Sequence, residues 1–217
     1  MLSRVVQPAA ALVVALMVAA CGASPSTTTP ASPEATADPS TAASSPASTA
    51  PVASDGRLDC VAPATPTTAQ TEGPYYTPGA PERDDLVEEG MAGTVITVSG
   101  WVVDTACRPL ANATVDVWQA DASGTYDNEG FRLRGVTRTG GDGRYTFRTV
   151  VPGQYPGRTE HIHVKVTPEG GRTLTSQMYF TGSTANEGDN IFSPDLLLSL
   201  AESPDGLTGT FTFVVEG

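Results

Sequence analysis

The sequence predicts an all-β fold, an antiparallel β-sandwich, for the chain after residue 57. Several segments there are rich in β-branched and aromatic residues and alternate apolar with polar side chains. Clusters of Gly, Pro and Asp separate these segments, as turns separate the strands of a sandwich. One short helix is expected, over residues 196–200, with Ser193 as its N-cap.

The expected strands follow from these patterns in chain order. Residues 94–103 form the longest candidate and are bounded by Gly93 and Asp104. Residues 144–150 alternate regularly and follow Asp142-Gly143, a hairpin-type turn signal. The other expected strands cover residues 113–118, 161–166, 175–180 and 210–215.

The N-terminus has the features of an export signal. Arg4 precedes an apolar run over residues 9–20, which is too short to span a membrane. The sequence Val18-Ala19-Ala20-Cys21 resembles a bacterial lipobox, in which the cysteine is acylated. We therefore expect a signal peptide over residues 1–20 and lipidation at Cys21, with ordinary signal cleavage as the alternative.

Residues 21–57 are predicted to be a lipid-anchored, disordered linker. They consist almost entirely of Ser, Thr, Ala and Pro and contain no aromatic residue, so they cannot bury enough apolar surface to fold. The protein is then exported, with its folded domain at residues 58–217 on the outer side of the membrane. Its only membrane contact would be the N-terminal lipid.

Charge and cysteine content exclude several classes of protein. The chain has 12 Lys and Arg residues against 24 Asp and Glu residues, and this net charge of −12 argues against nucleic-acid binding. No Cys-x-x-Cys pair is present, which excludes a zinc ribbon or a thioredoxin-type site. With Cys21 assigned to the lipid, Cys60 and Cys107 are expected to form a disulfide, and two free thiols are the alternative.

The two histidines of the chain, His161 and His163, share one expected strand. Side chains alternate across a strand, so Ile162 and Val164 would face the core and both histidines the opposite side. Two imidazoles at this spacing can reach one metal ion. A solvated strand face is the alternative.

Several motifs in this order resemble the intradiol ring-cleavage dioxygenases, the protocatechuate and catechol dioxygenase group. They extend over most of the expected domain. The motifs are Gln70-Thr71-Glu72-Gly73-Pro74-Tyr75-Tyr76, Val117-Trp118-Gln119-Ala120-Asp121 with Tyr126, Arg134-Gly135, Asp142-Gly143-Arg144-Tyr145-Thr146-Phe147, Pro152-Gly153-x-Tyr155, Arg158-x-x-His161-Ile162-His163 and Gln177-Met178-Tyr179-Phe180.

The resemblance implies a mononuclear non-haem iron(III), Fe(3+), held by Tyr126, Tyr155, His161 and His163. It also implies an active-site arginine at Arg158, for which a surface salt bridge is the alternative. Tyrosine titrates near pH 10 and needs a hard, strongly Lewis-acidic ion to bind as phenolate, whereas zinc and iron(II) usually take other ligand sets. Two phenolates with two neutral imidazoles therefore favour iron(III).

The resemblance further implies that Gln177 lines the pocket and that Gly73, Pro74 and Tyr75 form one wall of it. For the last three residues, a rigid turn that packs Tyr75 into the core is the alternative. Trp118, which belongs to an alternating strand, is expected in the core rather than against the substrate.

The implied function is that of an oxidoreductase. It would use O2 to cleave a small aromatic diol between its two hydroxylated carbons and give a muconate-type diacid. A non-catalytic, transthyretin-like binding module on the cell surface is the main alternative, because such sandwiches host many functions. A zinc hydrolase that uses His161 and His163 is a weaker option, since no carboxylate or cysteine stands at ligand spacing.

Overall fold

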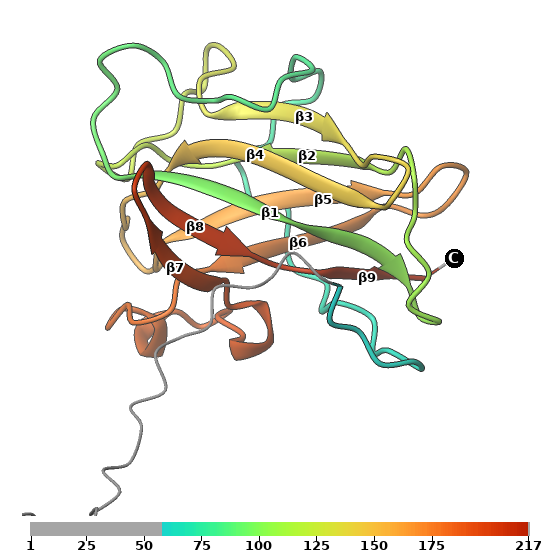
Figure 1. Ribbon diagram of the computed structural model, residues 1–217. Helices are drawn as coiled ribbons and strands as arrows, with labels where there is room; N and C mark the ends of the chain where they lie inside the picture. Colours follow the sequence, from blue (N-terminus) through green and yellow to red (C-terminus); the bar gives the residue numbers. More distant parts are fainter. Residues whose placement is uncertain (1–57, 217) are drawn as a thin grey trace, which may run out of the picture. The chain divides into compact units, whose positions relative to one another are not determined.

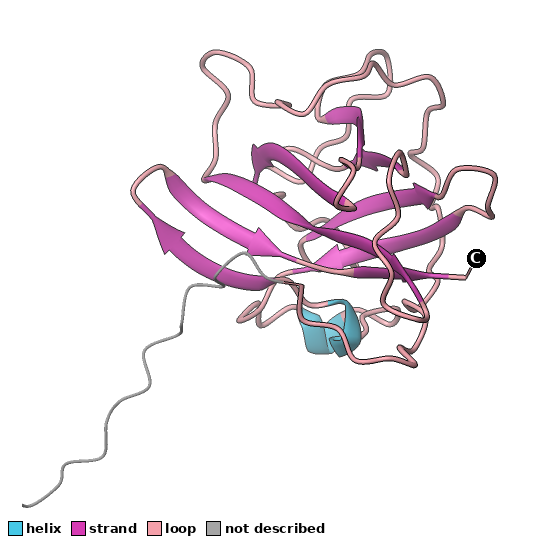
Figure 2. Cartoon of the chain, turned by 45° about the vertical axis from the view of Figure 1, so that its right-hand side comes forward, coloured by secondary structure: helices cyan, strands magenta, loops and turns pink. Residues whose placement is uncertain are grey.

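The computed structural model describes residues 58–216, which contain nine strands and two short 3₁₀-helices (Figure 1). The predicted signal peptide, the linker and Cys21 lie outside the described residues. Within residues 58–216, no helix is long and apolar enough to cross a membrane. The predicted all-β fold is confirmed, and within the described part of the chain helical turns appear only between β6 and β7 (Figure 2).

The first sheet has the strand order β4-β1-β8-β7, with β9 paired to the far part of β1. The strands are β1 (Val95–Asp104), β4 (Arg144–Val150), β7 (Ser199–Ser203), β8 (Gly206–Thr210) and β9 (Phe213–Val215). β1 runs antiparallel to β4 but parallel to β8 and β9, so this sheet is mixed where the sequence predicts antiparallel pairing throughout.

The second sheet is fully antiparallel and has the order β3-β2-β5-β6. Its strands are β2 (Thr114–Trp118), β3 (Arg134–Arg138), β5 (His161–Thr167) and β6 (Leu174–Tyr179). Its inner face supplies Val115, Val117, Ile162 and Val164 to the core between the sheets, and all four are fully buried. The histidines of β5 therefore lie on the outer face of this sheet, as the alternation predicts.

The expected helix over residues 196–200 is wrong. A 3₁₀-helix, η2 (Pro194–Leu196), occupies its start, and the Ser193 side chain does not cap it. Leu197 is already extended, and the Leu198 amide donates to the Tyr179 carbonyl at 2.9 Å. Leu196 and Leu198 are both fully buried, and this two-residue alternation fits an extended chain better than a helix.

The expected strand over residues 210–215 is interrupted. β8 ends at Thr210, and pairing with β1 resumes at Phe213. Between them, the Phe211 carbonyl accepts a hydrogen bond from the Tyr145 hydroxyl at 2.9 Å. Tyr145 is a buried core residue, and its hydroxyl needs this partner.

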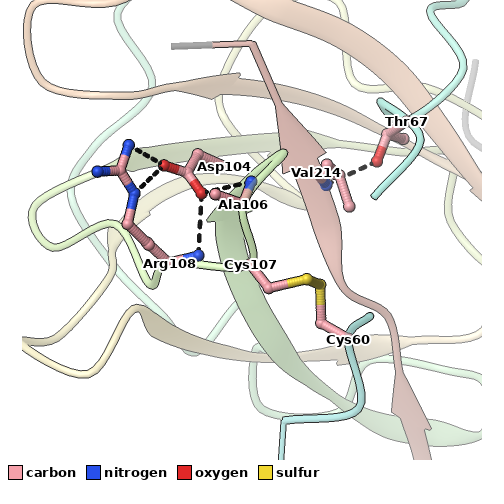
Figure 3. The surroundings of a disulfide bond; sticks show 7 residues. All are labelled: Cys60, Thr67, Asp104, Ala106, Cys107, Arg108 and Val214. Atoms are coloured by element: carbon pink, nitrogen blue, oxygen red, sulfur yellow. Dashed lines mark hydrogen bonds and ion pairs between the residues drawn. A yellow bond between two sulfur atoms is a disulfide. The ribbon is translucent and has the colours of Figure 1, made fainter. Parts of the chain in front are cut away.

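The structure contains the expected disulfide between Cys60 and Cys107 (Figure 3). It ties the start of the described chain to the turn after β1, where Asp104 accepts the amides of Ala106 and Arg108, each at 2.9 Å. From Cys60 the chain runs beside β9 and β6 toward the outer face of the second sheet, which it partly covers.

Candidate active site

The outer face of the second sheet carries a row of chemically functional side chains. His163 of β5 lies opposite Trp118 of β2 and Gln177 of β6, and His161 lies opposite Tyr179. Both histidines are almost fully buried, at 2% and 1% exposure. The solvated-face alternative is therefore wrong.

Two loops bring tyrosines to these histidines. Tyr126 lies in the loop after β2, and Tyr155 lies in the loop after β4. The Tyr126 Oη atom is 3.4 Å from His161 Nε2, and the Tyr155 Oη atom is 3.5 Å from it. His163 Nε2 is 3.2 Å from the same nitrogen. Two phenol oxygens and two imidazole nitrogens thus converge on one point.

Glycines allow the two tyrosine loops to pack backbone against backbone. The Gly153 amide donates to the Asp121 carbonyl at 2.8 Å. A Cβ atom on Gly124 would lie 2.1 Å from the Gln154 carbonyl oxygen, and one on Gly153 would lie 2.5 Å from the Ala122 carbonyl oxygen. Gly124 also has a φ of +82°, which glycine adopts without strain. This contact fixes the spacing between Tyr126 and Tyr155.

The histidines are held neutral with lone pairs available. The Nδ1 of His161 donates to the Thr159 carbonyl at 2.7 Å, so its Nε2 is left as the acceptor. Burial, reinforced by the charge of Arg158, lowers the pKa of His161 to about 4. Burial also lowers the pKa of His163 well below its usual value, with His161 and Arg158 adding to the effect.

The other two candidate metal donors are the phenols of Tyr126 and Tyr155, which must lose a proton to bind a metal ion as phenolates. Burial raises the pKa of both Tyr126 and Tyr155, so each phenol stays protonated at neutral pH unless a strong cation is beside it. Among residues 58–216, no group of three or more His, Cys, Asp and Glu side chains is placed to hold a metal ion. The ligand sets usual for zinc and iron(II) are therefore not built there, whereas two phenols with two imidazoles fit iron(III).

Arg158 stands beside these donors. Its Nη1 donates to Tyr155 Oη at 3.3 Å, and its Nη2 donates to Gln177 Oε1. Its Nε donates to Asp189 Oδ2 at 2.8 Å. The Arg158 side chain is only 15% exposed, so this ion pair is largely buried and belongs to the site, unlike the surface salt bridge considered as an alternative.

Gln177 is fixed from both ends. Its Nε2 donates to the Thr71 carbonyl at 3.1 Å, and its Oε1 accepts the Tyr179 hydroxyl at 3.0 Å. Gln177 is fully buried. Its side chain contacts Arg158 and Tyr179, and its expected place in the lining of the pocket stays a prediction.

The segment with Gly73, Pro74 and Tyr75 lies over the histidines and tyrosines. A Cβ atom on Gly73 would be 3.4 Å from His163 Cε1, so the backbone passes close to that ring. Pro74 is exposed. The Tyr75 ring stacks on Tyr126 with centroids 4.3 Å apart, so Tyr75 lies beside the site and outside the core between the sheets.

Comparison with known proteins identifies the family of this chain. A family model described as Dioxygenase matches residues 71–217. The chain belongs to the intradiol ring-cleavage dioxygenase family. It is 33% identical over 145 residues to the 6-chlorohydroxyquinol 1,2-dioxygenase of Cupriavidus pinatubonensis, a match that covers 55% of this chain and 52% of that protein.

Solved structures show the same relationship. The dioxygenase domain of a dioxygenase carbohydrate-binding protein fusion from Streptomyces sp. SirexAA-E is 48% identical, with a TM-score of 0.68, over 70% of this chain and 99% of that one. The 3-chlorocatechol 1,2-dioxygenase of Rhodococcus opacus 1CP is 31% identical, with a TM-score of 0.63, over 68% and 72%. The chain spans about half the length of the curated relatives it matches.

Two cavities flank Tyr155 in this family member. One, of about 300 Å³, is lined by Tyr75, Tyr126 and Tyr155 together with neutral loop residues. The other, of about 500 Å³, is lined by Tyr155 and Arg158 and, from the loop after β6, by Thr184, Ala185 and Gly188. Both volumes fall in the range usual for small-molecule sites.

Three residues of the site were not assigned to it from the sequence. Trp118 is buried, as expected, but it belongs to a small cluster with Ala120 and Tyr126 and stacks on His163 with centroids 4.8 Å apart, so it also supports the site. Tyr179 lies two residues from Gln177 and therefore on the same face of β6. This spacing could have assigned Tyr179 to the site from the sequence. Asp189 lies in a loop with no pattern that would have marked it.

Proposed function

We propose that this chain is an iron(III)-dependent intradiol dioxygenase. It cleaves a catechol-type aromatic between the two hydroxylated carbons with O2 and yields a muconate-type diacid. The observation that carries the proposal is the convergence of Tyr126 Oη, Tyr155 Oη, His161 Nε2 and His163 Nε2 in a buried site. The family and the relatives named above support it.

Tyr126, Tyr155, His161 and His163 would hold the iron. When bound, iron(III) supplies a Lewis acid for the two phenolates and redox chemistry for the reaction of the diol with O2. The two imidazoles need lose no proton to bind, because burial already holds both neutral.

The tyrosines also provide bases. A phenolate at a position where burial raises the phenol pKa takes up a proton readily. Tyr155 lines both cavities, so its Oη is placed to accept a proton from a diol hydroxyl.

Arg158 stabilises negative charge that develops on the diol. Its guanidinium is largely buried and held on three sides by Asp189, Tyr155 and Gln177. A cation fixed in a site of low polarity needs no reorganisation during the reaction and acts more strongly than one in water.

Product analysis under ¹⁸O₂ tests the proposal. The iron-loaded full chain is supplied with catechol, hydroxyquinol, protocatechuate and chlorocatechols, and with resorcinol as a control whose hydroxyls are not adjacent. We expect O2 consumption and a diacid that carries both labelled atoms from at least one 1,2-diol, and none from resorcinol. If the 1,2-diols bind without O2 consumption, the non-catalytic binding module is the better description.

We further propose that the protein is exported and anchored through a lipid on Cys21. Support comes from the lipobox-like sequence and from the Cys60–Cys107 disulfide, a bond typical of extracytoplasmic proteins. Cys21→Ser should move the protein from the membrane fraction to the soluble fraction. A wild-type protein that is already soluble would contradict the anchor.

A further inference from the structure

The loop between β6 and β7 contains a buried carboxylate that accepts three hydrogen bonds. Asp189 Oδ2 accepts the Arg158 Nε at 2.8 Å and the Thr159 amide at 3.1 Å. Asp189 Oδ1 accepts the Ile191 amide at 3.0 Å. The Asp189 side chain is 1% exposed. It touches none of the four metal-donor atoms, and the proposed chemistry gives it no direct part.

The Asp189 carboxylate fixes the Nε edge of the Arg158 guanidinium, which faces away from the four metal-donor atoms. The guanidinium is planar and its N–H directions are rigid, so fixing Nε determines where Nη1 and Nη2 point. They point to Tyr155 Oη and Gln177 Oε1. The direction of the cation toward Tyr155 is therefore set by Asp189.

We infer that Asp189 is a positioning residue, which acts on the reaction through Arg158 by holding its guanidinium against Tyr155 and Gln177. The inference rests on the proposed dioxygenase function and deepens it.

The loop holds Asp189 independently of Arg158. The neighbouring Asn186 accepts the Thr159 hydroxyl at 2.7 Å and donates to the Phe180 carbonyl at 3.1 Å. Because these bonds tie the loop to Thr159 and Phe180, the carboxylate is a fixed anchor, and the flexible arginine adjusts to it.

The charges of the pair are stable at neutral pH. Burial alone would lower the pKa of Arg158, but the hydrogen bond to Asp189 together with the nearby Asp189, Tyr155 and Tyr179 groups outweighs it, and the pKa is raised. Burial alone would raise the pKa of Asp189, but the hydrogen bonds from Arg158 and from two amides hold it below its usual value. Arg158 therefore remains a cation while its position is fixed.

The chain offers a matched control at Asp104. This carboxylate also accepts an arginine Nε, from Arg108 at 2.6 Å, and two backbone amides (Figure 3). It lies at the end of β1 beside the disulfide, away from the tyrosines and histidines. Asp104→Ala thus removes a similar network without touching Arg158.

A double-mutant cycle on the iron-loaded full chain tests the inference. We expect Asp189→Ala to lower kcat for the best 1,2-diol by roughly tenfold or more, since a small misplacement of a catalytic group has large effects, and to change KM less. In an Arg158→Ala background the same substitution should change kcat by less than about twofold, because its effect passes through Arg158. Asp104→Ala should keep the wild-type kcat.

Two results would overturn the inference. One is a wild-type kcat for Asp189→Ala. The other is an equal fall in both backgrounds, which would indicate a general structural role. If Asp189→Ala does not fold, Asp189→Asn replaces it, since the amide keeps the volume but offers one acceptor oxygen where the carboxylate uses two.

A crystal structure of the Asp189 variant separates this inference from the proposed function. If the wild type cleaves no 1,2-diol, the proposed function is wrong, and the position of the guanidinium alone decides the role of Asp189. The inference predicts that Arg158 leaves Tyr155 and Gln177 in the variant. A guanidinium that stays on both partners would contradict it.

Discussion

Replacing Gly124 by alanine should separate the two tyrosine loops and weaken iron binding. The new Cβ atom would lie 2.1 Å from the Gln154 carbonyl oxygen, whereas ordinary contact begins at 3.4 Å. The loops must therefore move apart by the difference, about 1.3 Å. Metal–donor distances tolerate deviations of only about 0.2 Å, so Tyr126 and Tyr155 could no longer reach one ion without distortion.

The expected magnitude is about 10–100-fold in iron affinity, as for other changes to the residues that orient metal ligands. The left-handed conformation adds a penalty of roughly 1–2 kcal/mol to the free energy of folding. Iron affinity is measured by competition with a chelator while the visible absorption of the protein is followed. The free energy of unfolding is measured in urea on the same samples.

Gly170→Ala is the matched control. Gly170 has a φ of +69°, but a Cβ atom there would meet nothing within 4 Å. The Gly170→Ala variant should lose stability through backbone strain alone and keep its iron affinity. The reasoning is refuted if Gly124→Ala binds iron as tightly as the wild type, or if Gly170→Ala weakens iron binding equally.

Three further predictions follow from the same structure. Tyr155→Phe and His163→Ala should each lose the visible band while circular dichroism shows an intact fold, and full activity in either variant would refute the ligand assignment. Replacing both Cys60 and Cys107 by alanine should lower the free energy of unfolding by about 4 kcal/mol, from the chain entropy of a loop with a sequence separation of 47, and urea titration measures the loss. Hydrogen bonds from the Arg108 amide and side chain lower the pKa of Asp104, so its stabilisation is present above about pH 4 and is lost as the pH falls through the folded pKa. Asp104→Asn should therefore flatten the fall in stability below pH 4, and an unchanged slope would contradict the assignment.

The strands that the sequence predicted well are those whose residues alternate regularly between polar and apolar. β4 has the predicted bounds, and β5 differs by one residue at its end. β3, β7 and most of β8 were missed, because their residues are polar or glycine-rich and carry little alternation. These segments form strands because they pair with neighbouring strands, and a local sequence pattern does not contain that information.

In the candidate site, too, the sequence predicted the residues that a local pattern marks and missed those that only the fold brings together. The two-residue spacing placed His161 and His163 on one face, and the structure has them there. Asp189 was missed because it lies 31 residues from Arg158, and only the path of the loop brings them together. Trp118 is buried, as its strand pattern led us to expect, and its position next to the inward-facing Val117 puts it on the outer face beside His163.

Anaerobic titration of the metal-free full chain with iron(III), followed by visible absorption, tests the central claim most directly. If Tyr126, Tyr155, His161 and His163 hold one iron through two phenolates, a visible band grows linearly and stops at one iron per chain. A folded protein that stays colourless, or that binds iron without a visible band, would contradict the claim.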